Sequence, residues 1–194
     1  MKNIFIILIK QAYLQPLVYF TFNVLAGAQI KGYSHIRQHF SEISLTDNST
    51  AKMLLTISAI WVVISCILLA IGLLIKWKKK ILLSSLAISL FDTSMISGGL
   101  YPMGHSMHSL YGLDIVITLV PFLFSYELKG IIHERRFFTI SIFAGLYIFF
   151  HIWMMITQLD PQGYHGLTQR LFALIAFGWI AYLAYSVSRT QTSS

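Results

Sequence analysis

Apolar residues in this chain fall into six long runs, separated by short passages rich in polar residues. A helix needs about 20 apolar residues to cross the hydrocarbon core of a bilayer. Each run approaches that length, so the pattern predicts six membrane-spanning helices. The third run is the least apolar, and Pro121 lies in the middle of the fourth. We expect the helices at residues 11–28, 53–75, 81–100, 113–128, 137–158 and 171–187.

The composition agrees with this pattern. Of the 194 residues, 56% are hydrophobic and only 11% are charged, which is too little charge for the surface of a soluble domain. We therefore predict an all-α integral membrane bundle in which residues 1–194 form a single six-helix domain. The first ten residues resemble a signal peptide, but Lys10 interrupts the apolar run and no small-residue cleavage site follows. We interpret them as an uncleaved lead-in to the first helix.

The formal net charge of +7 does not indicate nucleic-acid binding, because the basic residues sit in short clusters beside the apolar runs, where they set topology. With both termini inside, ten of the fourteen Lys and Arg residues face the cytoplasm. The positive-inside rule therefore favours cytoplasmic N- and C-termini. The single cysteine, Cys66, lies inside an apolar run and forms no internal disulfide.

In this orientation the connections that follow the first, third and fifth helices all face outward. They contain the polar passages 32–44, 100–114 and 160–170. Five of the seven histidines therefore share the outer face: His35, His39, His105, His108 and His165. This coincidence is the strongest functional signal in the sequence.

The first of these passages has a residue spacing that suits metal binding. His35 and His39 are four residues apart and Glu42 follows three later, so all three share one face if the passage is helical. Two imidazoles on adjacent helical turns can hold one metal ion, as in zinc sites. The alternative is an interfacial amphipathic helix whose polar face also contains Arg37.

The second and third passages pair histidines with acids. His105 and His108 are three residues apart, and Asp114 is a candidate ligand, base or orienting carboxylate. Asp160 and His165 flank a Pro–Gly turn and could form an acid–base pair. The alternative for both passages is a surface loop that meets water and lipid headgroups.

Two further charged residues stand apart from the histidines. Arg170 could hold a lipid phosphate or a substrate carboxylate, although snorkelling to the headgroups is the simpler interpretation. Asp92 lies near mid-span, where an ionisable group costs several kcal/mol unless it is paired or hydrated. His151 in the fifth run is either its partner or a core residue.

Three fragments, in order across the six runs, resemble one known family: residues 32–42 (GYSHIRQHFSE), 101–103 (YPM) and 163–170 (GYHGLTQR). Together they resemble the bacterial membrane family called domain of unknown function 998, which is more distantly similar to Frag/DRAM/Sfk-type six-span proteins linked with lipid handling. The resemblance implies a six-helix multi-pass protein of the bacterial inner membrane and brings no established reaction.

We weigh three functions. The first is a hydrolase or transferase that acts on a lipid or lipid-linked substrate at the outer leaflet with a metal ion, zinc being the best candidate. The second is a non-enzymatic protein that binds lipid, senses, or assists a membrane-protein partner. The third is a small transporter that uses Asp92, although the paired repeats of many transporters are absent from the sequence.

The first function assigns roles to twelve residues. The metal ligands come from His35, His39, His105, His108 and His165. The catalytic acids and bases come from Asp114, Asp160 and Glu42. Substrate binding falls to Arg170, Arg37, Tyr101 and Asp92.

Overall fold

The computed structural model describes residues 4–108 and 110–190, and within them all regular structure is helical. Five segments are long and apolar enough to cross a membrane: Ile4–Ala28, Ser49–Trp77, Leu82–Leu100, Arg135–Ile156 and His165–Arg189. The first combines α1 (Ile4–Lys10), η1 (Gln11–Leu14) and α2 (Gln15–Ala28), and the others are α3, α4, α6 and α7. The predicted all-α, multi-pass membrane architecture is therefore confirmed at this level.

The first crossing begins earlier than the run at residues 11–28, because Ile4–Lys10 is also helical. Pro16 lies in the first turn of α2, where the missing N–H leaves no helical hydrogen bond unmade. The proline therefore marks the change from a 3-10 turn to α-helix without ending the crossing.

The fourth apolar run is not one long helix. It folds as η4 (Leu110–Thr118), a 3-10 helix, followed by the short α5 (Val120–Glu127). Gly112 adopts a φ of +89° near the start of η4, and Pro121 lies in the first turn of α5. Since proline cannot donate to a carbonyl four residues earlier, Pro121 favours an interruption between the two segments.

The side chains of the bundle indicate a lipid environment. Between residues 57 and 75, the exposed side chains of α3 are all isoleucines at helical spacing: Ile57, Ile60, Ile64, Ile67, Ile71 and Ile75. The opposite face of α3 is buried and includes polar contacts, such as the 2.9 Å hydrogen bond from Gln15 Nε2 to Cys66 Sγ. This inverted pattern, apolar outside and partly polar inside, is typical of a helix that faces lipid.

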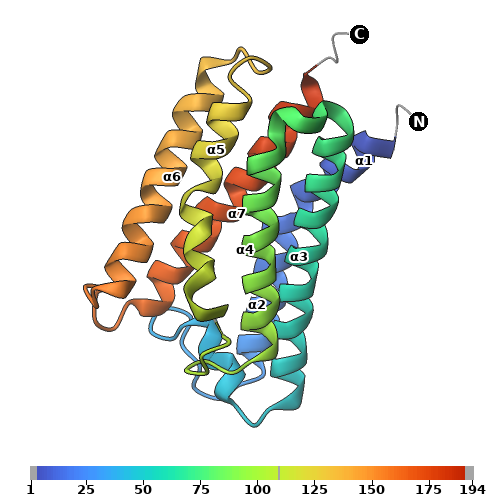
Figure 1. The fold of residues 1–194 in the computed structure, drawn as a ribbon. Helices are drawn as coiled ribbons and strands as arrows, with labels where there is room; N and C mark the ends of the chain where they lie inside the picture. Colours follow the sequence, from blue (N-terminus) through green and yellow to red (C-terminus); the bar gives the residue numbers. More distant parts are fainter. Residues whose placement is uncertain (1–3, 109, 191–194) are drawn as a thin grey trace.

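The long helices run roughly along one another, and α5 lies beside α6 (Figure 1). Both chain ends lie at one end of the bundle, close to η3 (Lys78–Ile81). The three polar connections, residues 29–48, 101–108 and 157–164, gather at the opposite end, which we call the polar end (Figure 1). The sequence predicted this gathering from the alternation of runs.

Candidate functional site

The first polar connection is not an α-helix, so His35, His39 and Glu42 do not share a helical face. Gly32 has a φ of +80°, and the residues after it form turns. His39 is extended, with a ψ of 153°, and precedes η2 (Phe40–Leu45), a 3-10 helix. The Glu42 carboxylate accepts the His39 backbone N–H at 2.8 Å, so this acid caps η2.

Arg170, in the second turn of α7, holds this connection in place. Its guanidinium lies 4.0 Å from the centre of the Phe40 ring, in a cation–π arrangement. It also donates to four acceptors: the Gln38 carbonyl (3.0 Å), the Gly166 carbonyl (2.7 Å), the Tyr33 hydroxyl (3.1 Å) and His35 Nδ1 (2.9 Å). Partial burial, together with the positive charge of Arg170, lowers the pKa of His35. His35 is therefore a neutral hydrogen-bond acceptor for Arg170.

The start of α7 packs directly against the same connection. The Leu167 N–H donates to the Ile36 carbonyl at 2.9 Å, and the Gln169 side-chain oxygen accepts the Phe40 N–H at 2.6 Å. Gly166 permits this approach, since a Cβ atom there would lie 2.7 Å from the His35 carbonyl oxygen. These contacts bring the first and third polar connections together.

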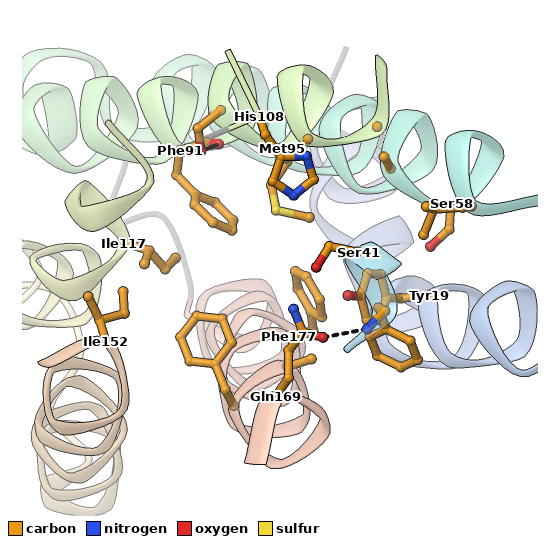
Figure 2. A pocket seen from close by; sticks show the side chains of 18 of the residues that line it. Tyr19, Ser41, Ser58, Phe91, Met95, His108, Ile117, Ile152, Gln169 and Phe177 are labelled. Carbon is orange, nitrogen blue, oxygen red and sulfur yellow. Dashed lines mark hydrogen bonds between the residues drawn. The ribbon is translucent and has the colours of Figure 1, made fainter. Parts of the chain in front are cut away.

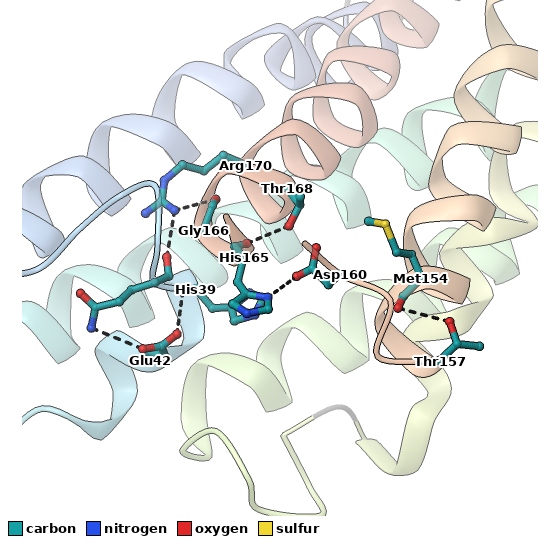
Figure 3. Close-up of polar contacts among 10 residues, drawn as sticks. His39, Glu42, Met154, Thr157, Asp160, His165, Gly166, Thr168 and Arg170 are labelled. Carbon is teal, nitrogen blue, oxygen red and sulfur yellow. Dashed lines mark hydrogen bonds and ion pairs between the residues drawn. The ribbon is translucent and has the colours of Figure 1, made fainter. Parts of the chain in front are cut away.

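The outcome is a cluster of His39, Asp160 and His165 at the polar end (Figure 3). Each residue offers one ligand atom, and the three atoms lie within 4.8 Å of one another. His165 Nδ1 donates to Asp160 Oδ2 at 2.7 Å. The rings of His39 and His165 are 5.5 Å apart between centroids and tilted by 30°. The two imidazoles therefore face a shared space beside the carboxylate.

The protonation states suit a cation. Burial lowers the pKa of His39 below its usual 6.5, and it outweighs the opposing effect of the nearby carboxylates. Burial alone would raise the pKa of Asp160, but hydrogen bonds from His165 and Thr168 and the neighbouring imidazoles bring it below 3.8. At neutral pH the cluster thus contains a neutral His39 and an ionised Asp160.

Two atoms of the cluster are buried without a hydrogen-bond partner: His39 Nδ1 and Asp160 Oδ1. Buried polar atoms in folded proteins are normally satisfied, and an unpaired one often marks a bound water or ion. Two imidazoles and one carboxylate are the ligand set of many catalytic zinc sites, which keep a fourth position for water. The cluster has the chemistry for such an ion.

The second polar connection remains separate from the cluster. His105 stacks on Tyr101 at 4.9 Å between ring centroids, and its Nδ1 accepts the Met107 N–H. His108 Nδ1 donates to the Tyr101 carbonyl at 2.8 Å. These residues lie in turns, so His105 and His108 do not share a helical face. The connection contacts the first one through the Met103 N–H, which donates to Ser44 Oγ.

Arg37 and Asp92 are not members of the cluster. Arg37 is exposed in the first connection. Asp92 is buried in α4, with both carboxylate oxygens lacking a hydrogen-bond partner among the described residues. The side chain of Asp114 lies outside the residues that the structure describes.

A cavity of about 190 Å³ lies directly beneath the polar end (Figure 2). Its wall is mainly aromatic and aliphatic, with Phe91, Met95 and Phe177 among the largest side chains. Phe40 and Ser41, next to His39, and Gln169, one helical turn after His165, also line it. The cavity is therefore adjacent to the cluster.

The sequence analysis did not anticipate the parts played by Gln38, Gly166 and Gln169. The signal was present in the fragment His165-Gly166-Leu167, where a glycine in the first turn of a helix indicates close packing. The backbone that packs there belongs to a distant connection, and no local pattern specifies it.

Comparison with known proteins places the chain in a family. No curated protein and no solved structure matches it. Residues 14–186, which include all three polar connections and the His39–Asp160–His165 cluster, match the model of a family described as Protein of unknown function (DUF998). This match confirms the resemblance found in the sequence. The chain is therefore a member of the DUF998 family.

Proposed function

We propose that the chain is an integral membrane protein whose His39–Asp160–His165 cluster binds a divalent metal ion, zinc in the first place. The observation that supports this most is the pair of buried, unpartnered ligand atoms, His39 Nδ1 and Asp160 Oδ1, in a cluster with spacing suited to one ion. An ion between them would satisfy both atoms.

The three residues have complementary roles in this proposal. His165 Nδ1 and Asp160 Oδ2 lie 2.7 Å apart and share a proton, and an ion would take the place of that proton beside His165 Nδ1. His39 is neutral and supplies a second nitrogen. Asp160 Oδ1 supplies a negative oxygen. Arg170 acts through position, because its bonds hold the first connection against α7.

A metal ion at this place supports hydrolysis or group transfer. Zinc lowers the pKa of its bound water to about 7 and polarises a carbonyl or phosphoryl oxygen. The cluster lies at the end of a bundle with lipid-facing sides, and an apolar cavity lies below it. The proposed substrate is accordingly a membrane lipid or a lipid-linked molecule, cleaved at headgroup depth.

We also propose six crossings, with both termini in the cytoplasm of a bacterium and the polar end outside. The nine residues of η4 extend about 18 Å and the eight of α5 about 12 Å at the usual rises. Together they span about 30 Å, the thickness of the hydrocarbon core. The basic residues Lys76, Lys129, Arg135, Arg136 and Arg189 all lie near the other end, as the positive-inside rule requires.

A non-enzymatic, lipid-binding protein is the second candidate, and the cavity favours it independently of any metal. Such a protein would present a bound lipid to a membrane-protein partner. The cavity does not support the transporter hypothesis, because Asp92 is not among the residues that line it.

Metal analysis of the purified protein tests the first proposal. We expect about one zinc ion per chain in protein prepared without chelator, and a loss of most of it in His39→Ala and His165→Ala. His105→Ala is the matched control, because His105 is an exposed histidine of the same end outside the cluster. Wild-type protein free of metal after growth with added zinc, or equal zinc in all variants, would rule out this site.

Hydrolytic activity is measured separately, as the release of headgroup or fatty acid from extracted bacterial lipids. Activity that disappears with a chelator and returns with zinc supports the enzyme. Zinc binding without any turnover would favour the lipid-binding alternative.

A further inference from the structure

The wall of the cavity beneath the polar end includes a buried histidine that the proposed metal site does not use. His151, in α6, lines the cavity and is only 2% exposed, and its Nε2 is buried without a hydrogen-bond partner. We propose that this cavity binds the acyl chain of a membrane lipid and that His151 Nε2 forms a hydrogen bond with the carbonyl oxygen at the head of that chain. This inference rests on the proposed function only in placing the headgroup at the metal.

The ring of His151 is held rigidly. It stacks on Phe172 of α7, with 4.8 Å between the centroids and 23° between the planes, and lies parallel to the more distant Tyr147. These contacts occupy the faces of the imidazole and leave its edge for a polar partner. Because a buried polar nitrogen without a partner costs free energy, an oxygen in the cavity would be stabilising.

Three other polar atoms of the wall already have partners. Ser94 donates to the Phe91 carbonyl, Ser58 accepts from Asn23, and the Gln169 oxygen accepts from Phe40. A sugar or nucleotide would need several free donors and acceptors, whereas a fatty acyl group needs one at its carbonyl and none along its chain. The mainly aromatic and aliphatic wall of the cavity therefore suits an acyl chain.

The depth of His151 agrees with this assignment. It lies five residues before the end of α6 at Ile156, which is about 7.5 Å along the helix axis. Asp160 follows in the third connection, beyond the end of α6. An ester carbonyl likewise lies deeper in the membrane than the headgroup to which it is joined.

Water is the main competing occupant. A buried water normally makes about three hydrogen bonds, and a cavity of this volume would need several such molecules. Among the wall residues that the structure describes, only His151 has a fully buried side-chain atom without a partner. A wall that is mainly aromatic and aliphatic suits an amphiphile better than a chain of waters.

Photolabelling in nanodiscs tests the inference. The first probe is a phosphatidylcholine with a diazirine in its ester-linked acyl chain, and the second is the ether-linked analogue, which lacks the carbonyl. We expect the ester probe to label the cavity residues Phe172 and Phe177 of the wild-type protein. Labels confined to lipid-facing side chains such as Phe149 and Phe150 would overturn the inference.

Two pairs of variants sharpen the test. Ala173→Phe fills the cavity and should lower labelling about tenfold, whereas Leu174→Phe, on the exposed neighbouring position, should leave it unchanged. His151→Phe keeps the stacking and should lower ester labelling about fivefold, to the level of the ether probe, as expected for one ordinary hydrogen bond. His151→Gln should restore part of the difference.

All labelling is repeated after removal of metal with a chelator. Labels that persist in metal-free protein and respond to Ala173→Phe support the acyl site even if no metal is ever bound. Equal labelling of Ala173→Phe and Leu174→Phe refutes the acyl site, and so does an equal preference for the ester probe in wild type and His151→Phe. The zinc analysis decides the metal site separately. If Ala173→Phe fails to fold, the His151 pair and the wild-type label positions decide the question.

Discussion

Replacing Gly166 with alanine should separate the two connections that form the cluster. The Cβ atom of alanine would lie 2.7 Å from Arg170 Nη1 and 2.7 Å from the His35 carbonyl oxygen, and closer still to the Gln38 carbonyl oxygen. Arg170 can move, but the two carbonyls belong to the backbone of the first connection. That backbone is fixed by the Leu167–Ile36 hydrogen bond of 2.9 Å.

The magnitude follows from these contacts. Overpacking of this kind costs about 1–3 kcal/mol, and loss of a hydrogen bond to the charged Arg170 adds roughly 1.5–3 kcal/mol. The higher helix propensity of alanine offsets about 1 kcal/mol. A net loss of about 1.5–5 kcal/mol should lower Tm by roughly 3–20 °C on the scale of globular chains of this size. Bound zinc should fall with it, because His39 moves away from His165.

The assay is thermal unfolding in detergent, with metal content measured on the same samples. Gly178→Ala is the matched control, because Gly178 lies in the same helix and its Cβ would have no atom within 4 Å. It should be neutral or slightly stabilising, by up to about 1 kcal/mol. Equal Tm and equal zinc in the two variants would show that the first connection does not depend on its contact with α7.

Three further predictions concern pH, the intramembrane acid and topology. The pKa of His39 is lowered on folding, so the contribution of His39 to the stability of the folded chain is complete above pH 6.5 and is lost as pH falls through the folded-state pKa. Tm and zinc affinity should therefore fall together below pH 6.5, and His39→Gln should flatten the dependence of Tm on pH. Asp92→Asn should keep or raise Tm and leave zinc unchanged, because the carboxylate lacks a described partner; a clear loss of Tm would contradict this. Cys66 is buried and should not react with an impermeant maleimide. On intact cells Gln162→Cys should react with the maleimide and Lys129→Cys should not. The reverse pattern would contradict the proposed orientation.

The sequence predicted the architecture well because hydrophobic runs are a strong signal. Runs such as 53–75 became the long helix α3, and the alternation of runs placed three polar connections at one end. The fourth run was harder, because its length allows a crossing while Pro121 and the φ of Gly112 determine which kind of helix forms. Apolar content alone does not separate these cases.

The candidate site was predicted only in part. The spacing of His35 and His39 predicted that these two residues would be partners. In the structure His39 lies beside His165, and His35 accepts a hydrogen bond from Arg170. Long-range contacts of α7 determine this arrangement, and a rule based on spacing along one helix contains no information about them. The cavity was not predicted for a similar reason, because its wall residues are of the same kinds as those of the rest of the core.

The position of the chain ends has a practical consequence. Both emerge at the end opposite the polar connections (Figure 1), and the 29 residues of α3 correspond to a bundle about 43 Å long. An affinity handle at either terminus would attach the protein to a bead or sensor chip with its histidines turned toward the solution. One immobilised preparation could then serve for titrations with zinc and with lipid.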